Sequence, residues 1–131
     1  MQYRSLMALF CCVLSGCANM QTVQHAPLDA GTSHTFHASP KLVLKAVRES
    51  IPEVGLALKS ERTDDTETMF LAERGVTAFS WGEEVRIVVH PDASSVNVRI
   101  ISERAFAPNI TAKDFDNDLF TLITNKLNTH K

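Results

Sequence analysis

The amino-acid sequence predicts an α+β fold, a two-layer sandwich in which an antiparallel sheet of four to five strands carries two helices on one face. Two observations predict it. Apolar residues recur at helical spacing in one stretch after Pro40 and in another near the C-terminus. Between these stretches, apolar and polar residues alternate in several short runs, as in strands with one buried face. The predicted order is β-α-β-β-β-β-α, and 131 residues suit one small domain.

The first elements are a short strand near 34–37 and a helix after it. Ser39 provides an N-cap, and Pro40 occupies the first helical position, where its missing N–H does no harm. Pro52 and Gly55 are expected to end this helix. Its buried stripe is expected to contain Val43, Ala46, Val47, Ser50 and Ile51.

Four strands are expected next, at 56–61, 68–74, 85–90 and 96–103. The last two should form a hairpin with a four-residue loop at 91–94, because Pro91 cannot supply the positive φ of a two-residue primed turn. This loop pairs His90 with Ser95. One face of the sheet is expected to lie under both helices, and the other to meet solvent or a partner.

Arg86 and Arg99 are the candidate site on that second face, because the predicted hairpin sets them directly opposite each other. Like charges so placed repel. Either Glu84 neutralises the pair from a diagonal position in a weak surface network, or the two guanidinium groups bind an anion on an acidic partner or a phosphate-bearing molecule. Both alternatives remain open. The same register sets Val89 against Val96 and Ile87 against Val98.

The final helix is expected over 112–128, where Thr111 and Asp114 have the spacing of a capping box. Its apolar stripe should cover the hairpin, with Leu119 and Ile123 above Ile87 and Val98. The remaining members of the stripe are Phe115, Leu122 and Leu127.

No metal or other cofactor is predicted. The acidic run at 114–118 imitates the opening of a calcium loop, but Leu119 and Asn125 stand where an EF-hand needs Gly and Glu. His34 and His37 would point to opposite faces of a strand, and no third ligand is placed to complete a site.

The N-terminus has the features of a secretory signal over residues 1–16. Arg4 precedes an apolar run at 6–14, which is far shorter than the ~20 residues needed to span a bilayer. The segment Leu14-Ser15-Gly16-Cys17 resembles the lipobox of bacterial lipoproteins. That resemblance implies cleavage before Cys17, multiple acylation of Cys17 and, because Ala18 follows, transfer to the outer membrane.

Residues 17–33 are expected to form the lipidated N-terminus and a flexible tether, and residues 34–131 a single domain. A flexible linker of ~15 residues has a root-mean-square reach of ~20 Å, which favours a role near the membrane surface. Loss of Arg4 with the signal moves the formal net charge from -2 to about -3. This mild acidity argues against a nucleic-acid partner.

The segment Ser80-Trp81-Gly82-Glu83, together with the predicted element order, resembles small uncharacterised bacterial lipoprotein domains with a Ser-Trp-Gly-Glu motif. The resemblance covers about 34–128 and implies an architecture but no activity. Trp81 is expected either to cover the open end of the sheet or to serve as an exposed anchor for a partner protein.

The sequence shows no nucleophile with a recognisable base and no Gly-rich phosphate loop. We therefore expect a non-enzymatic binding or structural module that is lipid-anchored at the periplasmic face of the outer membrane and acts on another envelope component. The alternative is a small-ligand carrier or an enzyme that uses a pocket between the helices and the sheet.

Overall fold

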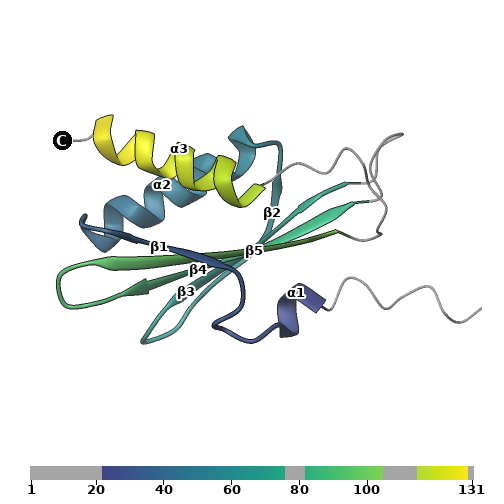
Figure 1. The fold of residues 1–131 in the computed structure, drawn as a ribbon, viewed down its shortest axis with the longest axis horizontal. Coiled ribbons are helices and arrows are strands. Elements are labelled where there is room, and N and C mark those ends of the chain that lie inside the picture. The colour runs from purple at the N-terminus through teal and green to yellow at the C-terminus, as the bar shows by residue number, and fades with distance from the viewer. Residues whose placement is uncertain (1–21, 76–81, 105–114, 130–131) are drawn as a thin grey trace, which may run out of the picture.

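The computed structural model describes residues 22–75, 82–104 and 115–129. These residues form an antiparallel five-stranded sheet in the order β1-β5-β4-β3-β2, with α2 and α3 together on one face (Figure 1). The predicted α+β fold is confirmed. The strands are β1 (Thr32–Phe36), β2 (Ala57–Thr63), β3 (Thr68–Arg74), β4 (Glu83–Pro91) and β5 (Val96–Arg104), and the helices are α1 (Thr22–His25), α2 (Pro40–Glu53) and α3 (Phe115–Thr129).

Helix α2 begins as the sequence predicts and ends slightly later. The side chain of Ser39 accepts a hydrogen bond from the N–H of Leu42 at 3.4 Å, and Pro40 follows the cap. Pro52 lies inside the last turn, and the helix continues to Glu53. Gly55, with φ of +87°, then redirects the chain towards β2. All five predicted stripe residues of α2 are buried.

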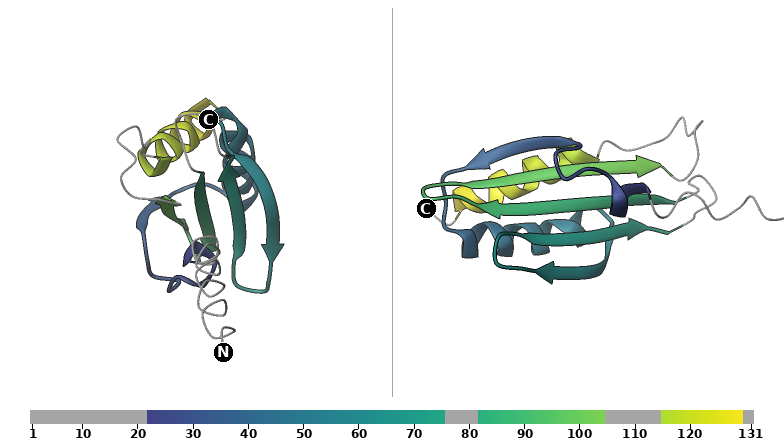
Figure 2. Two further views of the ribbon diagram at one scale, coloured as in Figure 1. Left: turned by 90° about the vertical axis from the view of Figure 1, so that its right-hand side faces the viewer. Right: turned by 90° about the horizontal axis from the view of Figure 1, so that it is seen from below.

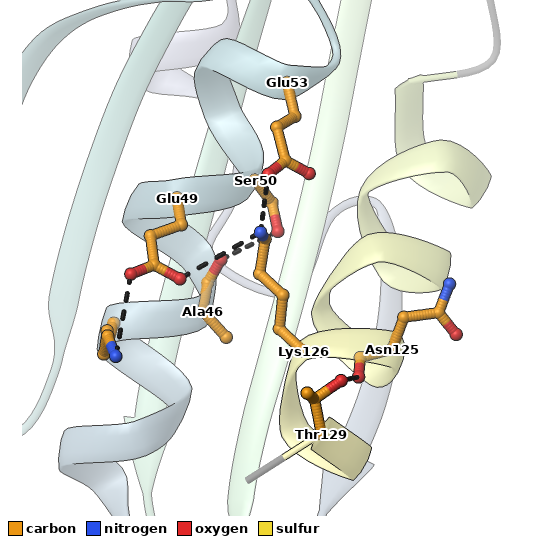
Figure 3. Close-up of polar contacts among 8 residues, drawn as sticks. Ala46, Glu49, Ser50, Glu53, Asn125, Lys126 and Thr129 are labelled. Carbon is orange, nitrogen blue, oxygen red and sulfur yellow. Dashed lines mark hydrogen bonds and ion pairs between the residues drawn. The ribbon is translucent and has the colours of Figure 1, made fainter.

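Lys126 of α3 joins the two long helices at one end. Its Nζ lies 2.6 Å from Oε1 of Glu53 and 4.0 Å from Oε2 of Glu49, both on α2 (Figure 3). On the same stretch of α2, Ser50 is fully buried and donates its hydroxyl hydrogen bond to the carbonyl of Ala46 at 2.7 Å. The interhelical contact is therefore polar at its solvent edge, while the buried hydroxyl is satisfied within its own helix.

The core lies between the two long helices and the sheet. Ile87, Val98, Leu119 and Ile123 are fully buried in one cluster, as predicted. The start of the final helix at 112–114, with its capping box, lies outside the described residues. From α3 the cluster also takes Phe120, whose ring stacks on that of His34 at a centroid distance of 4.0 Å.

The predicted register of the β4–β5 hairpin is wrong by two residues. Pro91 pairs with Val96 as the last ladder position, and the loop is 92–95 rather than 91–94. The loop closes with a 2.8 Å hydrogen bond from the N–H of Asp92 to the carbonyl of Ser95, and the Asp92 carboxylate accepts from the N–H of Ala93. Moving the loop by one residue shifts the pairing by two, so every side chain keeps its predicted face.

The shifted register separates the two candidate arginines. Arg86 pairs with Ile101, and Arg99 pairs with Val88, so the two arginines are diagonal rather than opposite. Both still lie on the face of the sheet away from α2 and α3. We call this surface of β4 and β5 the arginine face.

Residues 22–31, the described part of the chain before β1, lie on the arginine face. Helix α1 contacts β4 and β5 on the side of the sheet opposite α2 and α3 (Figure 1), and the view from below shows it in front of these strands (Figure 2). The sequence predicted a tether here and no helix. In its described part, residues 22–33, that stretch instead contributes α1 and the first residues of β1.

Candidate functional site

Arg86 holds the N-terminal segment, defined here as residues 23–31, through backbone carbonyls. Alternation along β4 places Ile87 in the core and Arg86 on the opposite face. The Nη1 and Nη2 atoms of Arg86 donate hydrogen bonds to the carbonyl oxygens of Ala26 at 2.6 Å and Pro27 at 2.7 Å. The side chain is thereby fixed at both ends of its guanidinium fork, and the residue is only 1% exposed.

Arg99 extends the same contact further along the segment. Its Nη1 donates to the carbonyl oxygen of Asp29 at 2.8 Å and to that of Gly31 at 3.4 Å. Because Arg86 and Arg99 are diagonal on neighbouring strands, their donors follow one another along the segment. The two arginines therefore bind four carbonyl groups from consecutive parts of it.

The side chains at the start of the segment complete the contact. Val23 is fully buried, although α1 has only four residues. Gln24 donates from Nε2 to Oε1 of Glu84 on β4 at 3.2 Å. By contrast, Leu28 is 55% exposed. The segment is thus held by one apolar anchor, by the Gln24 side chain and by its backbone.

Gly31 lets the segment pass close to β5 before it enters β1. Its φ is +94°, which L side chains rarely adopt. A Cβ atom at this position would lie 2.2 Å from the carbonyl oxygen of Ile100, a backbone atom that cannot move aside alone. Only glycine therefore fits this link between the segment and the sheet.

The electrostatics of the arginine face are incompletely balanced. Burial lowers the pKa of Arg86 from its ordinary value, while the charge of Glu67 acts in the opposite direction. In the described part of the chain, neither Arg86 nor Arg99 forms an ion pair, so carbonyl oxygens are their acceptors. Both Nε of Arg86 and Oε2 of Glu84 are buried without a hydrogen-bond partner. Each such group costs about 1–3 kcal/mol when left unsatisfied.

The structure places some predicted site residues and not others. Arg86 and Arg99 lie on one surface, as predicted, and the segment occupies their donors. Among the described residues Glu84 forms no ion pair with either arginine and accepts a hydrogen bond from Gln24, so neutralisation by Glu84 stays a prediction. Anion binding by the pair stays a prediction. Cys17 and Trp81 lie outside the described residues.

The surface also has shallow hollows. One of about 400 Å³ is lined by the β2–β3 turn, His90 and Pro91. In that turn Asp64 accepts hydrogen bonds from the N–H groups of Thr66 and Glu67, and the bond from Thr66 lowers the pKa of this carboxyl. The carboxylate thus serves the turn. The described residues contain no group of three or more His, Cys, Asp or Glu that could hold a metal ion. They also include no helix long and apolar enough to cross a membrane.

Sequence reasoning missed Val23 and Gly31 as parts of this surface. Val23 stands alone among polar residues, so no periodicity marks it. Gly31 was interpreted as part of a linker, although a lone glycine beside a strand also signals a close backbone approach. The carbonyl groups that Arg86 and Arg99 bind carry no sequence signature at all.

The chain matches no protein-family model and no curated protein sequence. The properties of the arginine face therefore come from its own geometry. Two guanidinium groups, the site of Val23 and the Glu84 carboxylate form the surface that holds the chain's own N-terminal segment.

Proposed function

We propose that this chain is a bacterial envelope lipoprotein, lipid-anchored through Cys17, whose α+β domain binds or braces another envelope component at the periplasmic face of the outer membrane. The lipobox-like sequence before Cys17 supports the anchor. The docked N-terminal segment is the observation that supports a role at the membrane. It holds Val23, six positions after Cys17, against the folded domain.

The docked segment shortens the distance between anchor and domain. Six residues, however they are arranged, span at most about 20 Å. If the whole stretch from Cys17 to Thr32 were free, its 15 residues could extend to about 50 Å. Docking therefore favours a partner that lies in or directly beside the membrane.

A binding role is supported by what the arginine face does within the chain. Its donors and its apolar anchor site recognise a peptide, and the described contacts of Arg86 and Arg99 involve no reaction chemistry. A face that holds a peptide segment in this way suits a binding module.

The test is metabolic labelling with a fatty acid in cells that produce the full chain, with membranes then separated into inner and outer fractions. Wild-type chain should carry label and fractionate with the outer membrane. Cys17→Ser should carry no label and stay unprocessed. Cys12→Ser is the matched control, since Cys12 lies in the predicted signal, and it should behave as wild type.

Label on the Cys17→Ser chain would refute the anchor. Affinity capture from membranes, with wild type and Cys17→Ser side by side, then tests the role. An envelope protein retained by the wild-type chain and lost with Cys17→Ser supports it, whereas equal recovery by both chains argues against a partner at the membrane.

A further inference from the structure

We propose that the arginine face is a peptide-binding surface that the N-terminal segment covers reversibly. When the segment leaves, the face takes a peptide segment of a partner protein that presents backbone carbonyls to Arg86 and Arg99 and an apolar side chain to the Val23 position. The inference rests on the proposed function in treating the domain as a binding module, and it names the chemistry of the partner.

Arg86 and Arg99 recognise the backbone of the segment and not its side chains. The bonds from Arg86 and Arg99 all end on carbonyl oxygens, which every residue of any peptide possesses. Val23 is the fully buried side chain of the segment, and residues such as Leu28 face solvent. A peptide of different sequence could therefore accept the same hydrogen bonds from Arg86 and Arg99, provided it carries a small apolar residue at the anchor position, whereas the bond to Glu84 depends on the Gln24 side chain.

The docked segment leaves two polar atoms of the arginine face without hydrogen bonds. Nε of Arg86 and Oε2 of Glu84 are buried on the same face of β4, two residues apart, and have no hydrogen-bond partner among the described residues. Arg86 itself is almost fully enclosed. A partner peptide that brought an acceptor to Nε or a donor to Oε2 would form hydrogen bonds that the segment does not supply. The face thus has hydrogen-bonding capacity that its present occupant does not use.

The strands that form the arginine face stay paired when the segment leaves. Arg86 lies between Leu71 of β3 and Ile101 of β5, and Val88 on the same face is 5% exposed. β1 is joined to β5 by its own ladder from Thr32 onwards, so the segment can leave while the sheet stays paired. An apolar floor crossed by two arginines is then open to a peptide.

Release would also lengthen the connection to the membrane. The nine residues of the segment, 23–31, add up to about 30 Å of reach when extended. Partner binding and reach are therefore coupled, since the same event opens the face and frees the domain to move away from the anchor.

The experiment measures binding of a labelled synthetic peptide to the full chain in detergent micelles by fluorescence polarisation. The probe has the sequence of residues 22–31, Thr-Val-Gln-His-Ala-Pro-Leu-Asp-Ala-Gly. Val23→Gly removes the anchor of the chain's own segment without adding charge. Leu28→Gly is the matched control, because it removes an exposed side chain from the same segment.

Apparent affinity scales with the fraction of chains whose face is open, so a segment that is docked most of the time hides the surface. Val23→Gly should bind the probe at least ~10-fold more tightly than wild type, while Leu28→Gly should match wild type. Adding Arg86→Gln to Val23→Gly should abolish the gain. A probe with glycine in place of its valine should bind the Val23→Gly chain more weakly than the intact probe does. Because both probes are tested on the same chain, differences in folding between variants do not affect this comparison.

Equal binding to Val23→Gly and wild type would overturn the proposal, as would full binding to the Val23→Gly, Arg86→Gln chain. Cys17→Ser should bind the probe as its parent does. Loss of lipid labelling with intact probe binding would therefore refute the anchor alone, and normal labelling without probe binding would refute the peptide surface alone.

Discussion

Arg86 donates a 2.7 Å hydrogen bond from Nη2 to the carbonyl oxygen of Pro27, 59 positions earlier in the chain. This contact joins the middle of the sheet to the stretch that follows the predicted lipidation site. The N-terminal segment and the sheet are therefore connected through a guanidinium group and not only through the covalent chain.

Arg86→Met should release the N-terminal segment while the domain stays folded. Methionine keeps much of the length and apolar character of the side chain but has no donors for the carbonyls of Ala26 and Pro27. Loss of the buried charge also removes its desolvation cost, so global stability should change little. Hydrogen exchange at the Ala30 amide, which bonds to the carbonyl of Pro27 at 3.0 Å, reports the release.

The matched control for that variant is Arg62→Met, an arginine exposed on the edge strand β2. It should leave exchange at Ala30 as in wild type. Unchanged protection of Ala30 in Arg86→Met would mean that Arg86 does not hold the segment.

Ile87→Ala and Leu119→Ala should each cost about 2–5 kcal/mol of unfolding free energy, because each removes methyl groups from a fully buried position of the core. Leu58→Ala is the control at a 45% exposed site and should cost less than about 0.5 kcal/mol. Denaturant unfolding checks all three. A control that lost as much as the core variants would contradict the assigned core.

Gly31→Ala should destabilise the chain more than Gly55→Ala. Both glycines have positive φ, +94° and +87°, so both variants incur the backbone strain of about 1–3 kcal/mol. At Gly31 the added methyl group would also meet the carbonyl of Ile100, whereas nothing lies within 4 Å of such a group at Gly55. Thermal melts of the two variants give the comparison, and equal losses would mean that the close approach at Gly31 is not present in solution.

The Arg48–Glu61 pair should add to acid sensitivity. Nε of Arg48 donates to Oε2 of Glu61 at 2.9 Å, and this hydrogen bonding lowers the pKa of the Glu61 carboxyl. Because the folded pKa lies below the unfolded one, the stabilisation is complete above the unfolded pKa and is lost as pH falls through the folded pKa. At a partly exposed site it amounts to about 0.2–1 kcal/mol.

Arg48→Met should therefore narrow the stability difference between neutral and acidic solution by that amount. Chemical denaturation across the titration range of glutamate measures it. A variant with the full acid sensitivity of wild type would show that the pair contributes nothing.

The elements were predictable because their apolar spacing records which face is buried. The stripe of α2, the alternation in β4 and β5, and the burial of Ile87 beneath the helices all followed from it. The predicted hairpin register is wrong, because the prediction places Pro91 in the loop on conformational grounds. Asp92 is the better signal for the loop. Its carboxylate accepts a hydrogen bond from the N–H of Ala93, which marks Asp92 as the first loop residue.

The docked segment could not be predicted for a physical reason. Arg86 was correctly placed on the outer face, but its acceptors are the carbonyls of Ala26 and Pro27, which look the same in every sequence. The one buried side chain, Val23, has no neighbours that repeat its pattern. Hydrogen bonds between backbone carbonyls and a side chain far away in the sequence produce no periodic pattern of residues.

Side-chain NMR of the chain in solution is the sharpest test of whether the N-terminal segment lies on the arginine face. Nuclear Overhauser effects should connect the methyl groups of Val23 to protons of β4 and β5, and the Nη protons of Arg86 should exchange slowly and show contacts to Ala26 and Pro27. Averaged, fast-exchanging Arg86 resonances, together with random-coil shifts and no long-range effects for residues 23–31, would contradict it.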